Sequence, residues 1–324
     1  MNDAKKRSDT ILYLVIPCYN EEEVLPETSR RLLEKLESLT SAGTVSAQSR
    51  ILFVNDGSRD KTWQLIEQLH QQHPQISGLK LSRNRGHQNA LLAGLMTARQ
   101  YADIIISMDA DLQDDVDAVD KFVEKYYEGN DIVYGVRSSR ATDTAFKRGT
   151  ASAFYKLMQA LGVDIVDNHA DYRLMSRRAV EALAEYREVN LFLRGIVPLV
   201  GFPSAIVTYE RHERFAGESK YPLKKMLSFA IDGITSFSVK PLRMITWLGI
   251  FIFLCSIVML LVLLLQKLFG HTVQGWTTLM GSIWMIGGIQ LFCLGMIGEY
   301  IGKIYAEVKQ RPRYIIEQFI NNEE

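Results

Sequence analysis

An apolar run that ends in a group of carboxylates constrains this chain most strongly. Residues 104–108 read Ile-Ile-Ile-Ser-Met, a length and composition typical of a strand buried on both faces of a parallel sheet. Asp109, Asp111 and Gln113 follow directly. Because open α/β sheets bind ligands at the carboxyl ends of their strands, we expect this turn to lie at a binding site.

The donor atoms in this turn favour a hard divalent cation. Carboxylate and amide oxygens, with no sulfur or imidazole in the same segment, suit Mg²⁺ or Mn²⁺ better than Zn²⁺. On a continuing strand Asp109 and Asp111 would share one face, whereas at a frayed strand end they would converge on one ion. The alternative is an acidic turn that faces solvent and caps the next helix.

Strands and helices are expected to alternate along the first 134 residues. Apolar runs predict strands at 12–17, 51–54, 79–81, 104–108 and 132–134. Helical spacing of apolar residues predicts helices at 22–39, 60–72, 87–101 and 116–128. This alternation predicts an α/β fold with a doubly wound, mostly parallel sheet.

Three polar motifs each follow a predicted strand directly. They are Pro-Cys-Tyr-Asn-Glu at 17–21, Asn-Asp-Gly-Ser at 55–58 and Asp-Ala-Asp at 109–111. In a parallel sheet all three lie at the same carboxyl edge, which predicts a shared site. Asp56 could accept hydrogen bonds from a base imide or a ribose hydroxyl, and Gly57 would permit close approach of a ligand. An ordinary Asp-Gly turn is the alternative at that pair.

Composition excludes several classes of protein. The 324 residues carry a formal net charge of zero, so nothing global indicates nucleic-acid binding. The three cysteines are too far apart in the sequence for a zinc or redox motif, and no disulfide framework is expected. The polar segment 1–10 and the short apolar run after it do not match a signal peptide, so we expect the polar part of the protein in the cytoplasm.

Two charge-free stretches near the C-terminus are long enough to cross a bilayer. They cover residues 245–265 and 276–298, and basic residues flank them on the outer sides. These flanking residues are Lys220, Lys224, Lys225, Lys240, Arg243, Lys303, Lys309, Arg311 and Arg313. Two such spans would make the protein multi-pass. The positive-inside rule then places both termini in the cytoplasm and the connection between the spans outside. Buried core helices of a soluble protein are the alternative.

Taken together, the motifs resemble those of glycosyltransferase family 2. The matching segments are VIPCYNEEE, VNDGSRDKT, LSRNRGHQNALLAG, MDADLQD, ADYRLMSRRAV and GESKY, followed by the double apolar stretch. The chain is most similar to the polyprenyl-phosphate glycosyltransferases, the group of bactoprenol glucosyltransferase and dolichol-phosphate mannose synthase. This resemblance runs from about residue 12 to residue 314 and implies a GT-A fold. It also implies inverting transfer of a sugar from a nucleotide donor to a lipid phosphate.

The resemblance implies a role for each matching residue. The nucleotide would contact Pro17, Tyr19, Asn20, Glu21, Asp56, Gly57, Ser58, Asn84, Gly86 and Asp109. Asp109, Asp111 and Gln113 would hold the divalent cation on the diphosphate, and Asp111 and Asp171 would be catalytic. Asp171 is either a general base or a positioning group, because a phosphate monoester with a second pKa of about 6 is already a dianion at neutral pH.

Basic residues supply candidates for binding phosphate and acceptor. They are Arg137, Arg140, Lys147, Arg214 and Lys220. Guanidinium groups beside a diphosphate are natural clamps. A solvated basic loop is the alternative for the first three, and attraction to anionic lipid head groups is the alternative for the last two. Residues 221–239 are expected to form an amphipathic helix at the membrane interface.

These features together predict a membrane enzyme with five segments. The segments are a polar tail (1–10), a GT-A catalytic domain (11–210), an acceptor loop with an interface helix (211–243), two transmembrane helices (244–300) and a cytosolic tail (301–324). The expected reaction moves glucose or N-acetylglucosamine from a UDP-sugar to undecaprenyl phosphate, at the inner membrane of a bacterium. The lipid-linked product would serve envelope glycosylation, and relatives suggest a homo-oligomer, with a tetramer expected.

Two other functions fit parts of the sequence. A processive polysaccharide synthase would need more spans and a Gln-x-x-Arg-Trp motif, which the chain lacks. A catalytically silent nucleotide-sugar sensor would not need the carboxylates at Asp109, Asp111 and Asp171, all of which are present.

Overall fold

The computed structural model describes residues 7–138, 169–189, 192–210, 240–268 and 275–322. The chain divides into two compact units, one carrying the sheet and the other carrying the two long C-terminal helices. The expectations for Arg140, Lys147, Arg214 and Lys220 lie outside the described residues, as does the predicted interface helix at 221–239.

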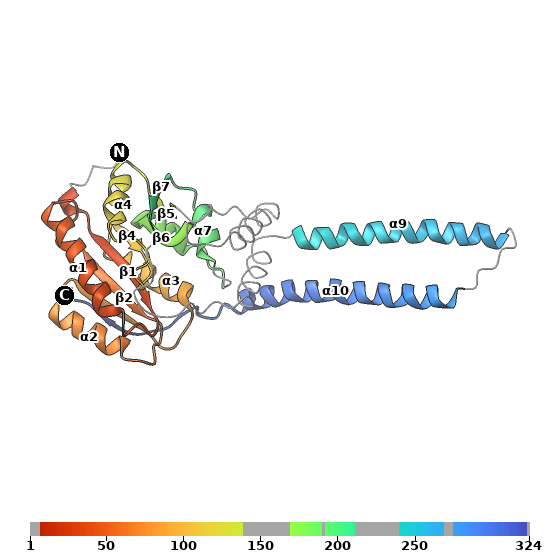
Figure 1. Ribbon diagram of the computed structural model, residues 1–324, viewed down its shortest axis with the longest axis horizontal. Coiled ribbons are helices and arrows are strands. Elements are labelled where there is room, and N and C mark those ends of the chain that lie inside the picture. The colour runs from red at the N-terminus through yellow and green to blue at the C-terminus, as the bar shows by residue number, and fades with distance from the viewer. Residues whose placement is uncertain (1–6, 139–168, 190–191, 211–239, 269–274, 323–324) are drawn as a thin grey trace. The chain divides into compact units, whose positions relative to one another are not determined.

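A mixed sheet forms the centre of the first unit (Figure 1). Its described strands are β1 (Leu12–Cys18), β2 (Arg50–Asn55), β3 (Ile76–Leu81), β4 (Ile104–Ser107), β5 (Ile132–Arg137), β6 (His169–Ser176), β7 (Ser204–Tyr209) and β8 (Ile316–Ile320). They lie in the order β7-β5-β6-β4-β1-β2-β3-β8. The β4-β1-β2-β3 segment is parallel, β6 runs antiparallel to β4 and β5, and β8 runs antiparallel to β3.

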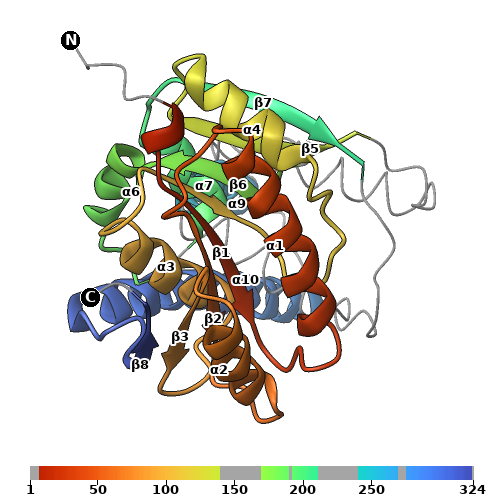
Figure 2. The same cartoon turned by 90° about the vertical axis from the view of Figure 1, so that its left-hand side faces the viewer.

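Helices cover both faces of this sheet. The described helices of the unit are the 3₁₀ helix η1 (Arg7–Asp9) and the α-helices α1 (Leu25–Ser41), α2 (Thr62–Gln72), α3 (His87–Ala98), α4 (Ala118–Tyr127), α6 (Arg177–Ala184) and α7 (Leu193–Leu199). Leu14 and Ile16 of β1 belong to a core cluster with apolar residues of α1, α2 and α4. The intervening Val15 faces α3, so α1 and α3 pack on opposite faces (Figure 2).

This architecture confirms the GT-A-like α/β fold, with the correction that the sheet is mixed. Every strand and helix predicted up to residue 134 occurs, with ends shifted by a few residues. The sequence interpretation did not predict β6, β7 or β8. In β6, the charged side chains of Asp171 and Arg173 interrupt the apolar pattern of a buried strand. The strand β8 lies in the predicted cytosolic tail, where it pairs with β3 and forms an edge of the sheet. The five predicted segment boundaries stay a prediction.

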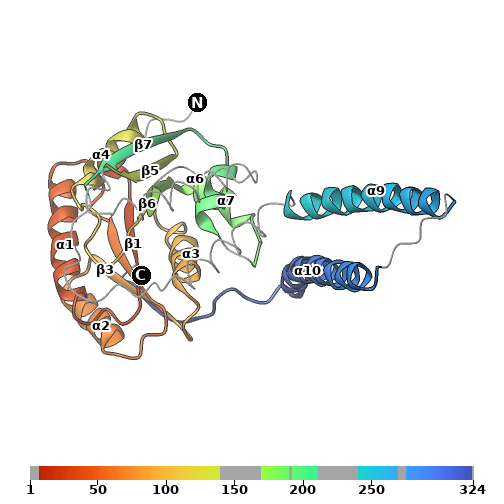
Figure 3. The ribbon, with the colours of Figure 1, turned by 45° about the vertical axis from the view of Figure 1, so that its right-hand side comes forward.

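The second unit contains α9 (Lys240–Leu268) and α10 (Trp276–Lys309), which lie side by side (Figure 1, Figure 3). Within the described residues, the segment Met285–Lys309 is long and apolar enough to cross a membrane, with a mean hydropathy of 1.4 over its most apolar window. Of the two predicted spans, the one in α10 is therefore supported, and the one in α9 is not confirmed and stays a prediction.

Close packing at Gly94 joins α3 to the sheet. A Cβ atom at this position would lie 2.4 Å from Cγ1 of Val15 on β1 and 2.8 Å from Cγ2 of Val54 on β2. Both neighbours are buried, β-branched and stiff, so they cannot swing away. The absence of a side chain at Gly94 thus sets how closely α3, whose first residue is His87, approaches the strands.

We predict that Gly94→Ala lowers the thermal unfolding midpoint of the protein in detergent. Alanine would otherwise gain about 1 kcal/mol of helix propensity over glycine. The overlap with two packed valines costs about 1–3 kcal/mol, which outweighs that gain and makes the net change destabilising. Gly94→Val should lower the midpoint further, and differential scanning fluorimetry measures both. An unchanged or raised midpoint in both variants would contradict this packing account.

Candidate active site

The carboxyl ends of β1, β2 and β4 gather three loops at one edge of the sheet. Strand β1 pairs in parallel with both of its neighbours, in register from Tyr13↔Arg50 to Cys18↔Asn55 and from Leu12↔Ile104 to Val15↔Ser107. The prediction that the three polar motifs share this edge is therefore confirmed. The roles assigned to their individual residues stay predictions.

The loops after β1 and β2 are tied together by hydrogen bonds. The backbone N–H of Asn20 donates to Oγ of Ser58 at 3.0 Å, and the backbone N–H of Arg59 donates to Oδ1 of Asn20 at 2.9 Å. Glu21 donates its backbone N–H to Oγ1 of Thr62 at 2.9 Å. Asn20 has a φ of 54°, a left-handed conformation that asparagine tolerates better than most residues. Pro17 is the penultimate residue of β1, which ends at Cys18, and Tyr19 directly after the strand is exposed.

Asp56 fixes the turn that leads into α3. Its buried carboxylate accepts hydrogen bonds from the backbone N–H groups of Arg85 at 2.7 Å and Gly86 at 2.9 Å. Burial raises the pKa of Asp56, and these two donors oppose that rise. A carboxylate has about four acceptor positions, so the predicted contact of Asp56 with a nucleotide stays compatible with this arrangement.

Glycine is required at position 57, beside that same turn. Gly57 has a φ of 63°, and a Cβ there would lie 2.5 Å from both the backbone C of Arg83 and the backbone N of Asn84. Asn84 in turn accepts the Gly86 N–H through Oδ1 at 3.2 Å. The loops after β2 and β3 are thereby in contact, which brings Asn84 and Gly86 to the predicted nucleotide edge.

The acidic loop starts where β4 ends at Ser107. Asp109 and Asp111 therefore lie in a loop and not on a continuing strand. Oδ1 of Asp111 accepts the backbone N–H of Gln113 at 3.2 Å, and Leu112 between them has a φ of 56°. Burial and the charges of Asp171 and Asp111 raise the pKa of Asp109, while His87 opposes this rise. Negative charge is thus concentrated in this loop.

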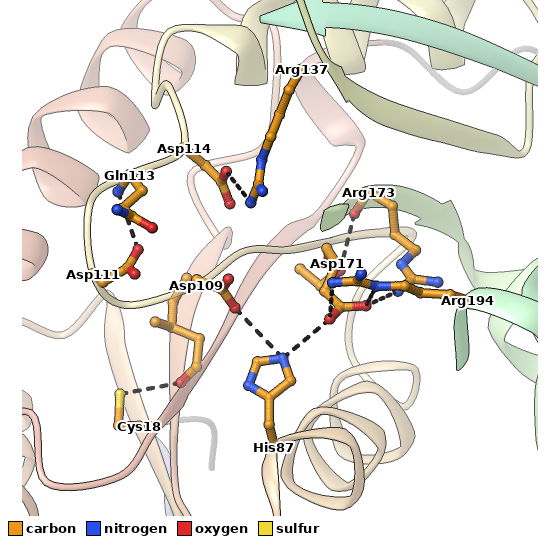
Figure 4. Close-up of polar contacts among 12 residues, drawn as sticks. Cys18, His87, Asp109, Asp111, Gln113, Asp114, Arg137, Asp171, Arg173 and Arg194 are labelled. Atoms are coloured by element: carbon orange, nitrogen blue, oxygen red, sulfur yellow. Dashed lines mark hydrogen bonds and ion pairs between the residues drawn. The ribbon is translucent and has the colours of Figure 1, made fainter. Parts of the chain in front are cut away.

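Asp114 is the buried member of the same loop. It accepts a hydrogen bond from the hydroxyl of Tyr209 at 2.6 Å, and Nη2 of Arg137 lies 3.7 Å from its Oδ1 (Figure 4). Its Oδ2 is buried without a hydrogen-bond partner. Burial, with the nearby charge of Asp109, raises the pKa of Asp114 to about 6. Arg137, predicted to bind phosphate, faces this carboxylate.

These donors fit a hard divalent cation that is shared with a ligand. Asp109, Asp111, Gln113 and Asp114 offer oxygen atoms only. The raised pKa values of Asp109 and Asp114 show negative charge that a cation would relieve. Within the described ranges, no group of three histidine, cysteine, aspartate or glutamate residues could hold a metal by itself. A cation in this loop would therefore need further ligands, such as the oxygens of a diphosphate.

Asp171 of β6 is held by two arginines at the other side of the site. Its Oδ1 accepts a hydrogen bond from Nη2 of buried Arg173 at 2.6 Å, and its Oδ2 accepts one from Nη2 of Arg194 at 3.1 Å (Figure 4). Burial alone would raise the pKa of Asp171, but Arg194, His87 and Arg173 hold it well below the usual range. Asp171 is therefore a carboxylate at physiological pH and a weak proton acceptor.

His87 lies between the two sides (Figure 4). Its Nε2 is 3.5 Å from Oδ1 of Asp109 and 3.5 Å from Oδ2 of Asp171. Burial lowers the pKa of His87, but the two carboxylates outweigh this effect and raise it to about 9. His87, the first residue of α3, thus contacts Asp109, which follows β4, and Asp171, which lies in β6.

Four residues of the site were not singled out from the sequence: His87, Asp114, Arg173 and Arg194. His87, Asp114 and Arg173 lie inside matching motifs, and the position of His87 after the strand at 76–81 could have indicated the same sheet edge. Arg194 lies 23 residues from Asp171, on a helix that no motif marks. Only the folded chain shows that contact.

Comparison with known proteins assigns this site to a family. The model described as glycosyl transferase family 2 matches residues 13–184, and the model described as GtrB C-terminal hairpin matches residues 240–304. The glycosyltransferase YkoT of Bacillus subtilis is 54% identical over 319 residues, which cover 98% of this chain and 95% of that protein. Bactoprenol glucosyl transferase of Shigella phage SfII is 41% identical over 307 residues, which cover 94% and 97%.

The mannosyl-3-phosphoglycerate synthase from Rubrobacter xylanophilus superposes with a TM-score of 0.47 at 15% identity, over 72% of this chain and 74% of that one.

The chain belongs to glycosyltransferase family 2 and is a glycosyltransferase. The resemblance on which the expected fold and site were based is confirmed by the extent of these matches, which include the C-terminal segment.

We predict that Asp171→Asn lowers the stability of the protein at pH 7, whereas Asp109→Asn leaves it unchanged or raises it. The depressed pKa of Asp171 means that its charge stabilises the fold above about pH 4, an effect that is lost as pH falls through the folded pKa. Asp171→Asn should therefore cost about 3 kcal/mol, because it leaves Arg173 buried without its counter-charge. The raised pKa of Asp109 means that its charge opposes folding, so Asp109→Asn should keep or raise the unfolding midpoint. Thermal unfolding of both variants, compared with the parent protein, measures these shifts. The account is wrong if Asp109→Asn is the less stable of the two.

Proposed function

We propose that this glycosyltransferase transfers a hexose from a UDP-sugar to undecaprenyl phosphate with inversion of configuration. The observation that carries this proposal is the meeting of the acidic loop and Asp171 at one sheet edge, where His87 lies 3.5 Å from both. Relatives that are 41% identical over 94% of the chain are named bactoprenol glucosyl transferases. That name supports a polyprenyl phosphate as the acceptor and glucose as the first sugar to test, with N-acetylglucosamine as the second.

The donor is assigned to the loops after β1, β2, β3 and β4. Tyr19 and the loop that contains Asp56 would contact the uridine, in keeping with the motifs that resemble the family. Asp111 and Gln113, with Asp109, would hold Mg²⁺ or Mn²⁺ together with the diphosphate oxygens. The cation, when bound, neutralises the charge that develops on the leaving UDP.

The acceptor is assigned to the side of Asp171. An oxygen of the lipid phosphate attacks the anomeric carbon as the bond from that carbon to the UDP oxygen breaks, so that the sugar moves and UDP leaves. A phosphate monoester is mostly dianionic at neutral pH, with a second pKa of about 6, and it needs no base. The low pKa of Asp171 supports a positioning role in preference to that of a general base. Arg194, held beside Asp171, is placed to orient an anionic group.

The C-terminal hairpin would keep the enzyme at its lipid substrate. The match to the GtrB hairpin and the apolar segment Met285–Lys309 support membrane attachment. We propose a bacterial cytoplasmic membrane location with two spans, both termini on the cytoplasmic side and a homo-oligomeric assembly. Envelope glycosylation would consume the lipid-linked sugar.

A transfer assay tests this proposal directly. Purified protein in detergent receives undecaprenyl phosphate, Mg²⁺ or Mn²⁺ and one radiolabelled UDP-sugar at a time, and label is followed into the organic phase. We expect transfer from one UDP-hexose, with chelator-sensitive formation of UDP. Binding of UDP without transfer from any sugar in the series would contradict the proposed reaction.

We predict that Asp111→Asn abolishes transfer while the protein stays folded. The substitution removes a negative oxygen from the proposed cation site and keeps the side-chain shape, so a loss of at least about 100-fold in kcat is expected. Asp117→Asn is the matched control, because Asp117 is an exposed aspartate nearby that pairs with Lys35. The control should retain full transfer. Undiminished turnover in Asp111→Asn would refute the assignment of the cation.

A further inference from the structure

We propose that His87 is a positioning residue that sets the separation of the two carboxylates across which the sugar is transferred. This inference rests on the proposed function, which assigns Asp109 to the donor side and Asp171 to the acceptor side. Neither the motif that contains His87 nor its place at the start of α3 gives it a role in the reaction. The geometry of the folded site supplies that role.

A single ring nitrogen of His87 lies near the carboxylates of both Asp109 and Asp171. Nε2 of His87 lies 3.5 Å from Oδ1 of Asp109 and 3.5 Å from Oδ2 of Asp171. These two oxygens are consequently no more than about 7 Å apart, the sum of the two distances. Two carboxylates this close repel each other, and Asp171 is buried while Asp109 is partly exposed. A donor between them allows both to stay near the reacting groups.

The backbone of His87 is fixed from several directions. The carboxylate of Asp56 accepts the N–H groups of Arg85 and Gly86 immediately before it. Nδ2 of Asn89 donates to the carbonyl oxygen of Arg85 at 2.8 Å, which closes the same turn. The backbone that carries the imidazole is therefore held by the protein's own hydrogen bonds. A residue that positions other groups requires such support.

The next residue connects the same turn to the acceptor side. Oε1 of Gln88 accepts the backbone N–H of Leu193 at 2.9 Å, at the first residue of α7. Arg194 follows and contacts Asp171. His87 thus contacts the carboxylate of Asp171, and Gln88 contacts the start of α7, the helix that carries Arg194. The N-terminal turn of α3 relates the donor loops to the acceptor loops.

The consequence for catalysis is a loss in kcat with little change in KM. In the proposed assignment, the groups that contact each substrate belong to the donor loops or to the side of Asp171, and His87 is not among them. The rate of transfer depends on the distance between the attacking oxygen and the anomeric carbon, and a misplacement of about 1 Å can cost about 100-fold. His87 acts on that distance through Asp109 and Asp171.

The test compares His87→Ala and His87→Gln in the full-length protein, with His73→Ala as control. Glutamine keeps an N–H donor at similar reach, whereas alanine removes it. His73 lies at the C-terminal end of α2, away from the acidic loop. Steady-state transfer gives kcat and the KM values for UDP-sugar and undecaprenyl phosphate. Calorimetry gives the Kd for UDP, and thermal unfolding reports on folding.

We expect His87→Ala to lower kcat about 30- to 100-fold while both KM values and the Kd for UDP stay within threefold. His87→Gln should recover at least fivefold of the loss, and His73→Ala should match the parent protein. The inference is overturned if His87→Ala has normal kcat, if its loss lies in either KM or in UDP binding, or if glutamine is as slow as alanine. Parent protein that transfers no sugar would instead refute the proposed function, and the two failures are therefore distinguishable.

Discussion

The gathering of carboxylates at one sheet edge is the constraint on which the rest of the site depends. The buried carboxylates of this edge, Asp56, Asp114 and Asp171, each require compensation of their charge. Asp171 has Arg173 and Arg194, Asp56 has two backbone N–H groups, and Asp114 has Tyr209 and Arg137. In the acidic loop, the pKa values of Asp109 and Asp114 nevertheless stay raised. That residual charge is what makes the loop suitable for a cation that arrives with a diphosphate.

The helix α3 relates the two sides of this edge. Its inner face lies against β1 and β2, because Gly94 leaves room for no more than a hydrogen atom beside Val15 and Val54. Its N-terminal turn is held by Asp56, and its first residue, His87, reaches both Asp109 and Asp171. Packing in the core thus fixes the position from which a polar group acts in the site. The same helix therefore packs into the core and carries the residue that we propose to position the two carboxylates.

The parallel part of the fold could be predicted from the sequence because local patterns encode it. The apolar run at 104–108 and its neighbours are continuous, and the order of strand and turn alone puts 17–21, 55–58 and 109–111 at one edge. The strand β6 was not predicted, since Asp171 and Arg173 are charged and become buried only by pairing with each other. The pairing of β8 with β3 joins residues more than 230 positions apart. No local pattern reports such a contact, nor that between Arg194 and Asp171.

A crystal structure with Mn²⁺ and UDP would test the central claim most directly, because the anomalous signal of manganese locates the cation without reference to activity. The account predicts one manganese peak between the diphosphate and the carboxylates of Asp109 and Asp111, with Asp171 still bonded to Arg173 on the opposite side. UDP bound at this edge with manganese on other residues would contradict the assignment of the acidic loop. UDP bound away from the carboxyl ends of β1, β2 and β4 would contradict the account as a whole.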